Sequence, residues 1–157
     1  GQSFIVTATI NPEPDTANQT TTTCSGVALD YNLQNLLPAG DMRSGSTFSY
    51  SVSSSDETNV PAASDRTTAP GGNITDNYTH TTNSSVTITY TVTPTSGQGC
   101  NGDNFTLEVT VKPEPVVNNQ VEAEICSRSA TGVTMGSNHV GKSVAPATVY
   151  ITNINSS

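Results

Sequence analysis

The sequence predicts an all-β protein built from antiparallel β-sandwich units in tandem, and three observations lead to that prediction. Apolar residues alternate with hydroxyl or amide residues in one short segment after another, as in strands that bury one face. No segment carries a sustained stripe of apolar residues at helical spacing. A motif near the N-terminus returns about a hundred residues later, and such a period matches the size of one small β-sandwich domain.

The repeated motif is an alternating strand followed by a proline-rich joint. Residues 4–14, FIVTATINPEP, return at residues 105–115 as FTLEVTVKPEP, and the Cys-Ser pair at Cys24 returns at Cys126. Proline cannot donate to a sheet ladder, and its ring holds φ near the polyproline value. Each Pro-Glu-Pro triplet is therefore expected to end its strand and to form a short, semi-rigid joint between units.

The repeat divides the chain into three parts. Residues 1–13 are predicted to be the last strand of a preceding unit with its linker, residues 14–115 a complete unit, and residues 116–157 the first part of a following unit. We expect the third part not to be an independent domain, because it contains only the opening strands of a unit.

Strands are expected wherever apolar residues occupy every second position. Thr is the usual residue in between, since its β-branched side chain fits a pleated surface while remaining polar. The polar segment 53–85 contains Pro and Gly and is expected to form long loops with one or two short edge strands, while Ile74 and Tyr78 form a single turn that plugs the core. The alternating segments up to residue 115 are 4–10, 27–33, 48–52, 86–92 and 105–111. The residues predicted to face inward in the complete unit are Leu29, Tyr31, Phe48, Tyr50, Ile88, Tyr90, Phe105, Leu107 and Val109.

Composition and charge narrow the function classes. The chain has 32% hydrophobic residues, a net charge of −8 and only five Lys and Arg residues. A chain with so few cations offers no basic patch for phosphate groups, which argues against a nucleic-acid partner. No apolar run reaches the length of a membrane span, which argues against membrane insertion. Few lysines, abundant Thr and Ser, and cysteines at the repeat period favour secretion into an oxidising space.

The cysteines predict one disulfide within the complete unit. Cys24 lies near the end of its first strand and Cys100 in the turn before its last strand. A bond between them would close a loop of about 77 residues and stabilise the unit by about 4 to 5 kcal/mol. Cys126 is the repeat equivalent of Cys24, so its partner is expected in the following unit. Three free, buried cysteines are the alternative.

The sequence contains no arrangement of residues typical of a catalytic or metal site. Neither His80 nor His139 lies at ligand spacing from a cysteine, and no nucleophile-elbow motif surrounds a serine. The acidic residues never form an Asp-x-Asp loop, so solvated surface carboxylates are favoured over a calcium site. We therefore predict no enzyme activity, no catalytic residue, no metal and no cofactor.

One stretch resembles a known family. Residues 90–115, YTVTPTSGQGCNGDNFTLEVTVKPEP, followed by the Cys126-Ser pair, are similar to the PKD-like repeats of large Bacteroidetes surface proteins. The resemblance implies an Ig-like β-sandwich, secretion to the bacterial cell surface, often by the type IX system, and a role in long adhesins or gliding-associated proteins. Asp15-Thr16-Ala17 also resembles the triplet at which these bacteria attach O-glycans, which implies glycosylation of Thr16.

These observations favour a non-catalytic spacer or stalk module of a long extracellular fibre or adhesin. Its partners would be the neighbouring repeats of the same polypeptide and, through lateral or strand-addition contacts, other copies of the chain. The alternative is a glycan- or protein-binding module that uses the loops of residues 53–85, with Tyr78 and His80 as the ligand-facing residues. A third possibility is a non-catalytic appendage of a secreted enzyme.

Overall fold

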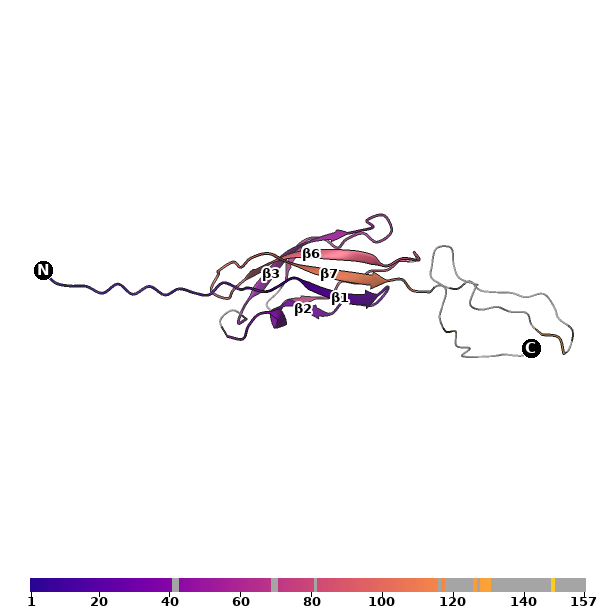
Figure 1. Ribbon diagram of the computed structural model, residues 1–157, viewed down its shortest axis with the longest axis horizontal. Coiled ribbons are helices and arrows are strands. Elements are labelled where there is room, and N and C mark those ends of the chain that lie inside the picture. The colour runs from indigo at the N-terminus through magenta and orange to yellow at the C-terminus, as the bar shows by residue number, and fades with distance from the viewer. Residues whose placement is uncertain are drawn as a thin grey trace.

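A computed structural model describes residues 1–40, 43–68, 71–80 and 82–115, together with residues 117, 126, 128–130 and 148. In this part of the chain two β-sheets form a sandwich, and residues 1–13 lead into it as a single extended segment (Figure 1). The expected all-β sandwich is therefore confirmed, and one 3₁₀ turn is the helical element of the described residues.

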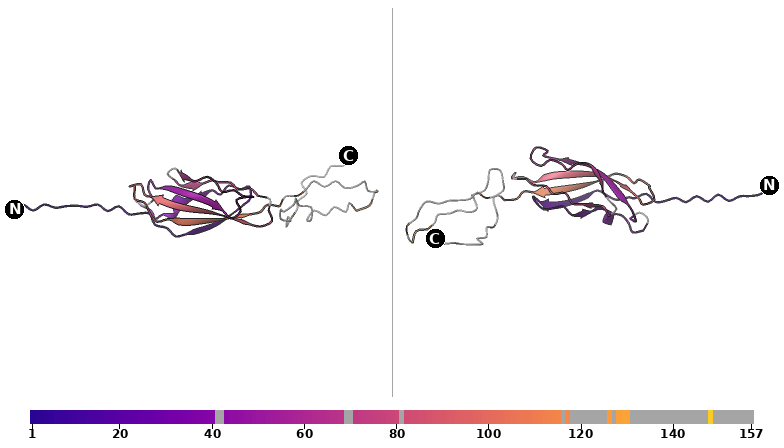
Figure 2. Two further views of the ribbon diagram at one scale, coloured as in Figure 1. Left: turned by 90° about the horizontal axis from the view of Figure 1, so that it is seen from above. Right: turned by 180° about the vertical axis from the view of Figure 1, so that it is seen from behind.

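The larger sheet has five strands in the order β1-β7-β6-β3-β4, and the smaller sheet pairs β2 with β5. All neighbouring strands are antiparallel except β1 and β7, which are parallel. Figure 2 shows the same layers from above and from behind. The elements are β1 Gln19–Cys24, β2 Tyr31–Asn32, η1 Leu33–Leu36, β3 Thr47–Ser54, β4 Arg66–Thr68, β5 Asn73–Ile74, β6 Val86–Thr95 and β7 Phe105–Lys112.

Strict alternation in the two central strands builds the core. In β6 the side chains of Ile88 and Tyr90 are fully buried, whereas Thr87 and Thr89, on either side of Ile88, are partly exposed. Ile88 pairs with Val109 and Tyr90 with Leu107, so the register puts both apolar pairs on one face of the sheet. The inward-facing residues are confirmed, except that Leu29 and Tyr31 are only partly buried and pack at the margin of the core.

The predicted strand at residues 27–33 is largely wrong. Only Tyr31–Asn32 form a strand there, and the 3₁₀ helix begins at Leu33. Gly26 has a φ of 78° and Asp30 a φ of 45°, values that an extended ladder cannot accommodate. The side chain of Asn32 then caps the helix by accepting a hydrogen bond from the backbone N–H of Asn35 at 3.0 Å. The apolar residues that the sequence pattern assigned to a strand are therefore positioned against the core by a series of turns.

The polar segment 53–85 forms loops and short strands, as predicted. β4 lies at the edge of the larger sheet, and β5 pairs with β2 in the smaller one. Ile74 and Tyr78 are both buried in the core, so the predicted plug is confirmed. The predicted turn is not, because Ile74 belongs to β5 and pairs with Tyr31.

β1 runs parallel to β7 because both strands begin at the same end of the sandwich. Pro14 is buried there against Gly102, which lies in the turn between β6 and β7. We call this end the N-terminal pole. β1 then crosses to the opposite end, the C-terminal pole, where Cys24 lies beside Lys112. The chain thus arrives at one pole and leaves from the other through residues 113–115 (Figure 1).

The predicted unit boundaries remain a prediction. All the strands lie inside the predicted complete unit, residues 14–115. Residues 1–13 have no strand partner among the described residues. The predicted first part of a following unit, residues 116–157, lies almost entirely outside the described residues, and so does His139.

Candidate functional site

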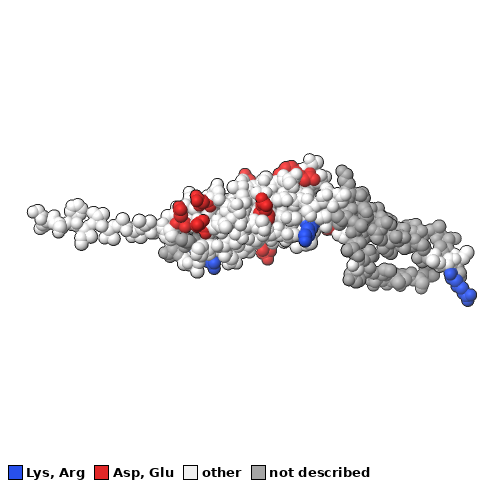
Figure 3. Space-filling model, in the orientation of Figure 1, with Lys and Arg blue, Asp and Glu red and all other residues white. Residues whose placement is uncertain are grey.

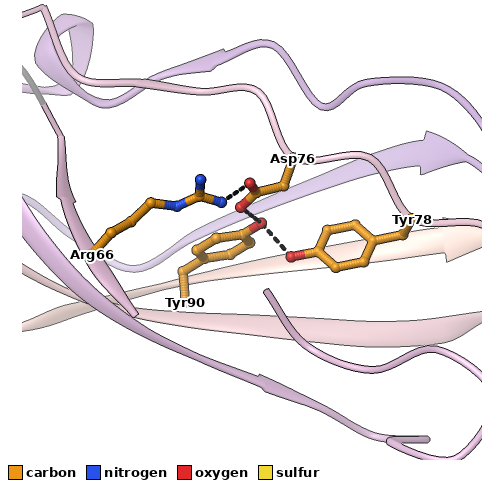
Figure 4. A network of polar contacts seen from close by, with 4 residues as sticks. All are labelled: Arg66, Asp76, Tyr78 and Tyr90. Carbon is orange, nitrogen blue, oxygen red and sulfur yellow. Dashed lines mark hydrogen bonds and ion pairs between the residues drawn. The ribbon is translucent and has the colours of Figure 1, made fainter. Parts of the chain in front are cut away.

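A polar network crosses the core between the two sheets (Figure 4). The buried hydroxyl of Tyr90 donates a hydrogen bond of 2.8 Å to Oδ2 of Asp76. The Tyr78 hydroxyl lies 2.6 Å from the Tyr90 hydroxyl, and it acts as the donor because the Tyr90 hydrogen is already engaged. Arg66, at the start of β4, forms an ion pair with Oδ1 of Asp76. The carboxylate of Asp76 is thus held on both oxygens, by an arginine on one side and a tyrosine on the other.

The surroundings of the two tyrosines keep them protonated. Burial raises the pKa of Tyr90 far above its usual value, and its hydrogen bond with Tyr78 raises it further. Burial also raises the pKa of Tyr78. A hydroxyl that is both neutral and fully engaged cannot serve as a base or a nucleophile near neutral pH. The network is therefore suited to joining the loop around Asp76 to β4 and β6, and not to proton transfer.

Aromatic contacts extend this network toward the surface. The rings of Tyr50 and Tyr90 meet edge to face, with centroids 5.4 Å apart at 71°. The guanidinium of Arg66 lies 5.8 Å from the centroid of Tyr50. An open depression of about 470 Å³ adjoins these residues, and hydroxyl side chains of β3 and β6 line much of it. Such a shallow, polar surface lacks the apolar walls of a small-molecule pocket.

His80 lies near the C-terminal pole and is hydrogen-bonded to Ser25, the residue that follows β1. Its backbone N–H donates to Oγ of Ser25 at 3.0 Å, and the same hydroxyl donates to the His80 carbonyl at 3.2 Å. The ring nitrogen Nδ1 lies 2.9 Å from Oγ1 of Thr82, while Nε2 is buried without a hydrogen-bond partner. A smaller cavity of about 220 Å³ is lined by His80, Thr82 and Glu114 among others.

At the N-terminal pole the chain packs tightly onto the turn between β6 and β7. A Cβ atom on Gly102 would lie 1.8 Å from the carbonyl oxygen of Pro14, so only glycine fits beneath this segment. Asn18 then accepts a hydrogen bond of 2.8 Å from the backbone N–H of Thr106 at the start of β7. Sγ of Cys100 lies 3.9 Å from the carbonyl oxygen of Asn11, the residue before the first Pro-Glu-Pro triplet.

At the C-terminal pole the second Pro-Glu-Pro joint, residues 113–115, follows Lys112. The carbonyl oxygen of Lys112 accepts a hydrogen bond of 2.8 Å from the backbone N–H of Ser25. Cys24, the residue before Ser25, is exposed and lies directly beside Lys112 in the ladder of β1 and β7. Oε2 of Glu114 lies over Gly26, 3.6 Å from the position that a Cβ atom would take there.

The predicted disulfide between Cys24 and Cys100 is wrong for this structure, in which both thiols are free. Cys24 lies at the C-terminal pole, level with the beginning of β6, whereas Cys100 follows the end of β6 at the N-terminal pole. The ten residues of β6 separate them, which corresponds to about 30 Å at the rise of a β-strand. A disulfide requires Cα atoms within about 7 Å of each other. The alternative of three buried thiols is also wrong, because Cys24 and Cys126 are exposed and Cys100 is partly exposed.

The other predicted site residues occupy different environments. Tyr78 and His80 are both at least nine-tenths buried, and His80 also lines the cavity of about 220 Å³. Their role as ligand-facing residues remains a prediction. Thr16 is partly exposed and lies between the buried Pro14 and the first residue of β1. Glycosylation of Thr16 remains a prediction.

Charged residues are few in this chain. On the face shown in Figure 3, acidic groups outnumber basic ones, and several of them lie close together near the end of the sandwich that the N-terminal segment enters. No three His, Cys, Asp or Glu side chains gather as metal ligands would in the part of the chain that the structure describes. Within the same residues no helix is long and apolar enough to cross a membrane.

The family of the chain follows from residues 21–115, which match a family model described as a PKD-like domain. The match covers more than half of the chain. The chain belongs to the PKD-like domain family. Such domains are typically non-catalytic extracellular modules. No curated protein and no solved structure matches this PKD-like domain.

Sequence reasoning missed two structural residues of this PKD-like domain. Asp76 looked like one of several scattered surface carboxylates, yet its side chain is only 9% exposed and binds both Tyr90 and Arg66. Nothing in the spacing of Asp76 marks it as buried. Gly102 carried a clearer signal, because it is the second glycine of the Gly-Cys-x-Gly turn, and its packing against Pro14 explains why the turn needs a glycine there.

Proposed function

We propose that this PKD-like domain is a non-catalytic spacer in a tandem array that forms a stalk or fibre at a bacterial cell surface. The observation that carries the proposal is that its two joints lie at opposite poles. Pro14 is seated on Gly102 at the N-terminal pole, and Lys112 leaves from the C-terminal pole beside Cys24. A unit connected in this way adds its whole length to a chain of units instead of folding back on its neighbour.

The segment before the domain supports this arrangement. Residues 4–10 have the alternating pattern of β7, whose alternate residues form the centre of the core. In the segment itself the corresponding apolar side chains are open to solvent: Phe4 is 85% exposed, Val6 78% and Ile10 91%. Such a strand needs a sheet to cover it. The sheet of a preceding unit is the simplest partner, and strand addition to another copy of the chain is the alternative.

The joints themselves are suited to a stiff stalk. Prolines restrict the backbone of each Pro-Glu-Pro triplet, and Pro14 is fully buried where the triplet meets the domain. Oε2 of Glu114 lies beside the turn at Gly26, and Glu114 lines the same cavity as His80 and Thr82, so the departing segment also runs along the sandwich. Both connections are therefore anchored to the folded unit and do not swing freely as a Gly-Ser linker would.

The alternative of ligand binding through Tyr78 and His80 receives no support from their positions, since both side chains are buried. Nothing else in the described loops presents an exposed aromatic platform of the kind that glycan-binding surfaces use. The spacer role also requires no catalytic residue, in keeping with the neutral, hydrogen-bonded tyrosines of the core network.

Small-angle X-ray scattering on a lengthened chain tests the proposal. In the duplicated chain, residues 1–115 are followed by residues 15–157, so that one unit occurs twice and a natural Pro-Glu-Pro joint connects the copies. We expect the maximum dimension to increase by about 35 Å over that of the 157-residue chain, which is the length of β6 plus its turns. A matched variant with Pro113→Gly and Pro115→Gly in the first copy should show a smaller increase. An increase no larger than that of the glycine variant would contradict the spacer role.

A further inference from the structure

We propose that consecutive units of the array are joined by disulfides across their joints, from the Cys24 position of one unit to the Cys100 position of the next. The inference rests on the proposed tandem arrangement. It replaces the bond within a unit, which the topology forbids because Cys24 and Cys100 lie at opposite poles.

The repeat makes Lys112 and Asn11 equivalent positions, because Lys112 precedes the second Pro-Glu-Pro triplet as Asn11 precedes the first. Each residue is therefore the last residue of one unit's final strand and directly precedes the joint to the next unit. When another unit follows residue 115, Lys112 should make the contacts with that unit that Asn11 makes here with the sandwich. When another unit precedes the sandwich, Asn11 should make the contacts with that unit that Lys112 makes here with its own.

Two cysteines converge on this single position. On the side of the preceding unit, the carbonyl oxygen of Lys112 accepts the backbone N–H of Ser25 at 2.8 Å, and Cys24 is the ladder neighbour of Lys112. On the side of the following unit, the sulfur of Cys100 lies 3.9 Å from the equivalent carbonyl oxygen, that of Asn11. A carbonyl oxygen has two lone pairs, so both contacts can be made at once.

The distances suit a bond across the joint. Covalent geometry puts the Cα atom of Cys24 within about 5 Å of the Lys112 carbonyl oxygen, and the following unit's sulfur lies 3.9 Å from the same oxygen. A disulfide brings two Cα atoms to about 4.4 to 6.8 Å. The two Cα atoms are therefore at most about 12 Å apart across the joint, a range that includes the separation of a disulfide, and both thiols can react because Cys24 is exposed and Cys100 partly exposed.

The reaction needs an oxidant of the disulfide class. Each of the two thiols loses one proton and one electron as the S–S bond forms, and oxidised glutathione takes up both electrons and both protons to give two molecules of reduced glutathione.

The same pairing applies to the remaining cysteines. Cys126, at the Cys24 position of its unit, pairs with a unit further along the array, and Cys100 pairs with a unit before residue 1. Every cysteine of the repeat then has a partner in an adjacent unit.

The duplicated chain described above tests the bond directly. With Cys126→Ser in the duplicated chain, oxidation by a glutathione buffer and tryptic digestion without reduction should link peptide 1–43, which contains the first Cys24, to the second copy's peptide 67–128, in which Cys100 is then the only cysteine. A bond within the first unit would instead link peptide 1–43 to the peptide that spans the joint, which has a different mass. Cys24→Ser in the first copy should abolish the link, and the same substitution in the second copy should leave it unchanged.

Scattering on the same sample separates this proposal from the spacer role. An extended, end-to-end particle whose thiols remain free, or which pairs them within a unit or between molecules, overturns the interunit disulfide and leaves the spacer role intact. A particle that is not extended overturns the spacer role and with it the geometry of the joint. The expected result is an extended particle with one bond between the first Cys24 and the second Cys100.

Discussion

Replacing Tyr90 by phenylalanine removes one oxygen atom from the centre of the sandwich and is expected to destabilise the domain strongly. The Tyr90 hydroxyl donates to Asp76 at 2.8 Å and lies 2.6 Å from the hydroxyl of Tyr78. The Tyr90→Phe variant keeps the ring, and thereby its edge-to-face contact with Tyr50. The loss of stability therefore reports the two hydrogen bonds and not a cavity.

The magnitude follows from the kind of bond that is lost. A hydrogen bond to a charged group contributes about 1.5 to 3 kcal/mol, and the buried Tyr78 hydroxyl left without an acceptor adds about 1 kcal/mol. Arg66 still neutralises Asp76, which limits the cost. We expect a loss of about 3 kcal/mol in the free energy of unfolding, which shifts the urea midpoint by about 1 to 2 M for a domain of this size.

The matched control is Tyr31→Phe. The Tyr31 hydroxyl makes no hydrogen bond in the described part of the structure, so its removal should change stability by less than about 0.5 kcal/mol. A double-mutant cycle with Tyr78→Phe should give a coupling energy of about 1 kcal/mol, since both variants break the same bond. Equal urea midpoints for Tyr90→Phe and Tyr31→Phe would refute the assignment of the network.

The same tyrosines predict a loss of stability at high pH. Burial raises the pKa of both Tyr78 and Tyr90 above the usual tyrosine value of about 10. Above that pH the unfolded chain releases protons that the folded domain retains, so the unfolding free energy falls by as much as about 1.4 kcal/mol per pH unit for each group. Below pH 10 the contribution is fully present. Tyr90→Phe should flatten this decline, whereas a slope identical to that of the unaltered domain would contradict it.

Two further substitutions, each with a matched control, test the packing at the N-terminal joint and in the core. Gly102→Ala should cost about 2 to 3 kcal/mol and speed hydrogen exchange at the Thr106 amide, because its Cβ atom would lie 1.8 Å from the backbone oxygen of Pro14. Gly99→Ala, in the same turn but in open space, should cost only about 1 kcal/mol from its positive φ and leave that exchange unchanged. Leu107→Ala, at a fully buried position of β7, should cost about 2 to 5 kcal/mol in urea unfolding. Thr91→Ala, on an exposed position of β6, should change stability by less than about 0.5 kcal/mol.

The parts of the fold that local pattern determines were predictable. β6 and β7 alternate strictly, because one face of each is covered by the core and the other is open, and the sequence shows that alternation directly. Residues 27–33 have the same pattern, but the positive φ values at Gly26 and Asp30 prevent a strand. A residue's tendency to adopt positive φ is a weak signal in sequence, especially for Asp, so the alternation misled the assignment there.

The separation of Cys24 and Cys100 was not predictable without the topology. The sequence shows that Cys24 and Cys100 occur once in the complete unit, which suggests that they bond to each other. It does not show that β1 runs parallel to β7 and carries Cys24 to the pole opposite Cys100. The buried network was hidden for a similar reason, since Arg66 and Asp76 lie in loops and edge strands whose positions depend on contacts with β6.

The parallel pairing of β1 and β7 also determines how the domain would resist tension in a stalk. Force applied through the two joints pulls on the start of β1 at one pole and on the end of β7 at the other. The strands then slide along each other, so the six paired positions from Gln19 to Cys24 are loaded together and do not open one at a time. Under reducing conditions, which open the proposed disulfide across the joint, we expect single-molecule stretching of the duplicated chain to give one distinct force peak per unit. Thr21→Pro, which fixes φ and removes an N–H in the middle of this ladder, should lower the peak. Extension without a peak in the unaltered chain would contradict this account of the fold as a tension-bearing element.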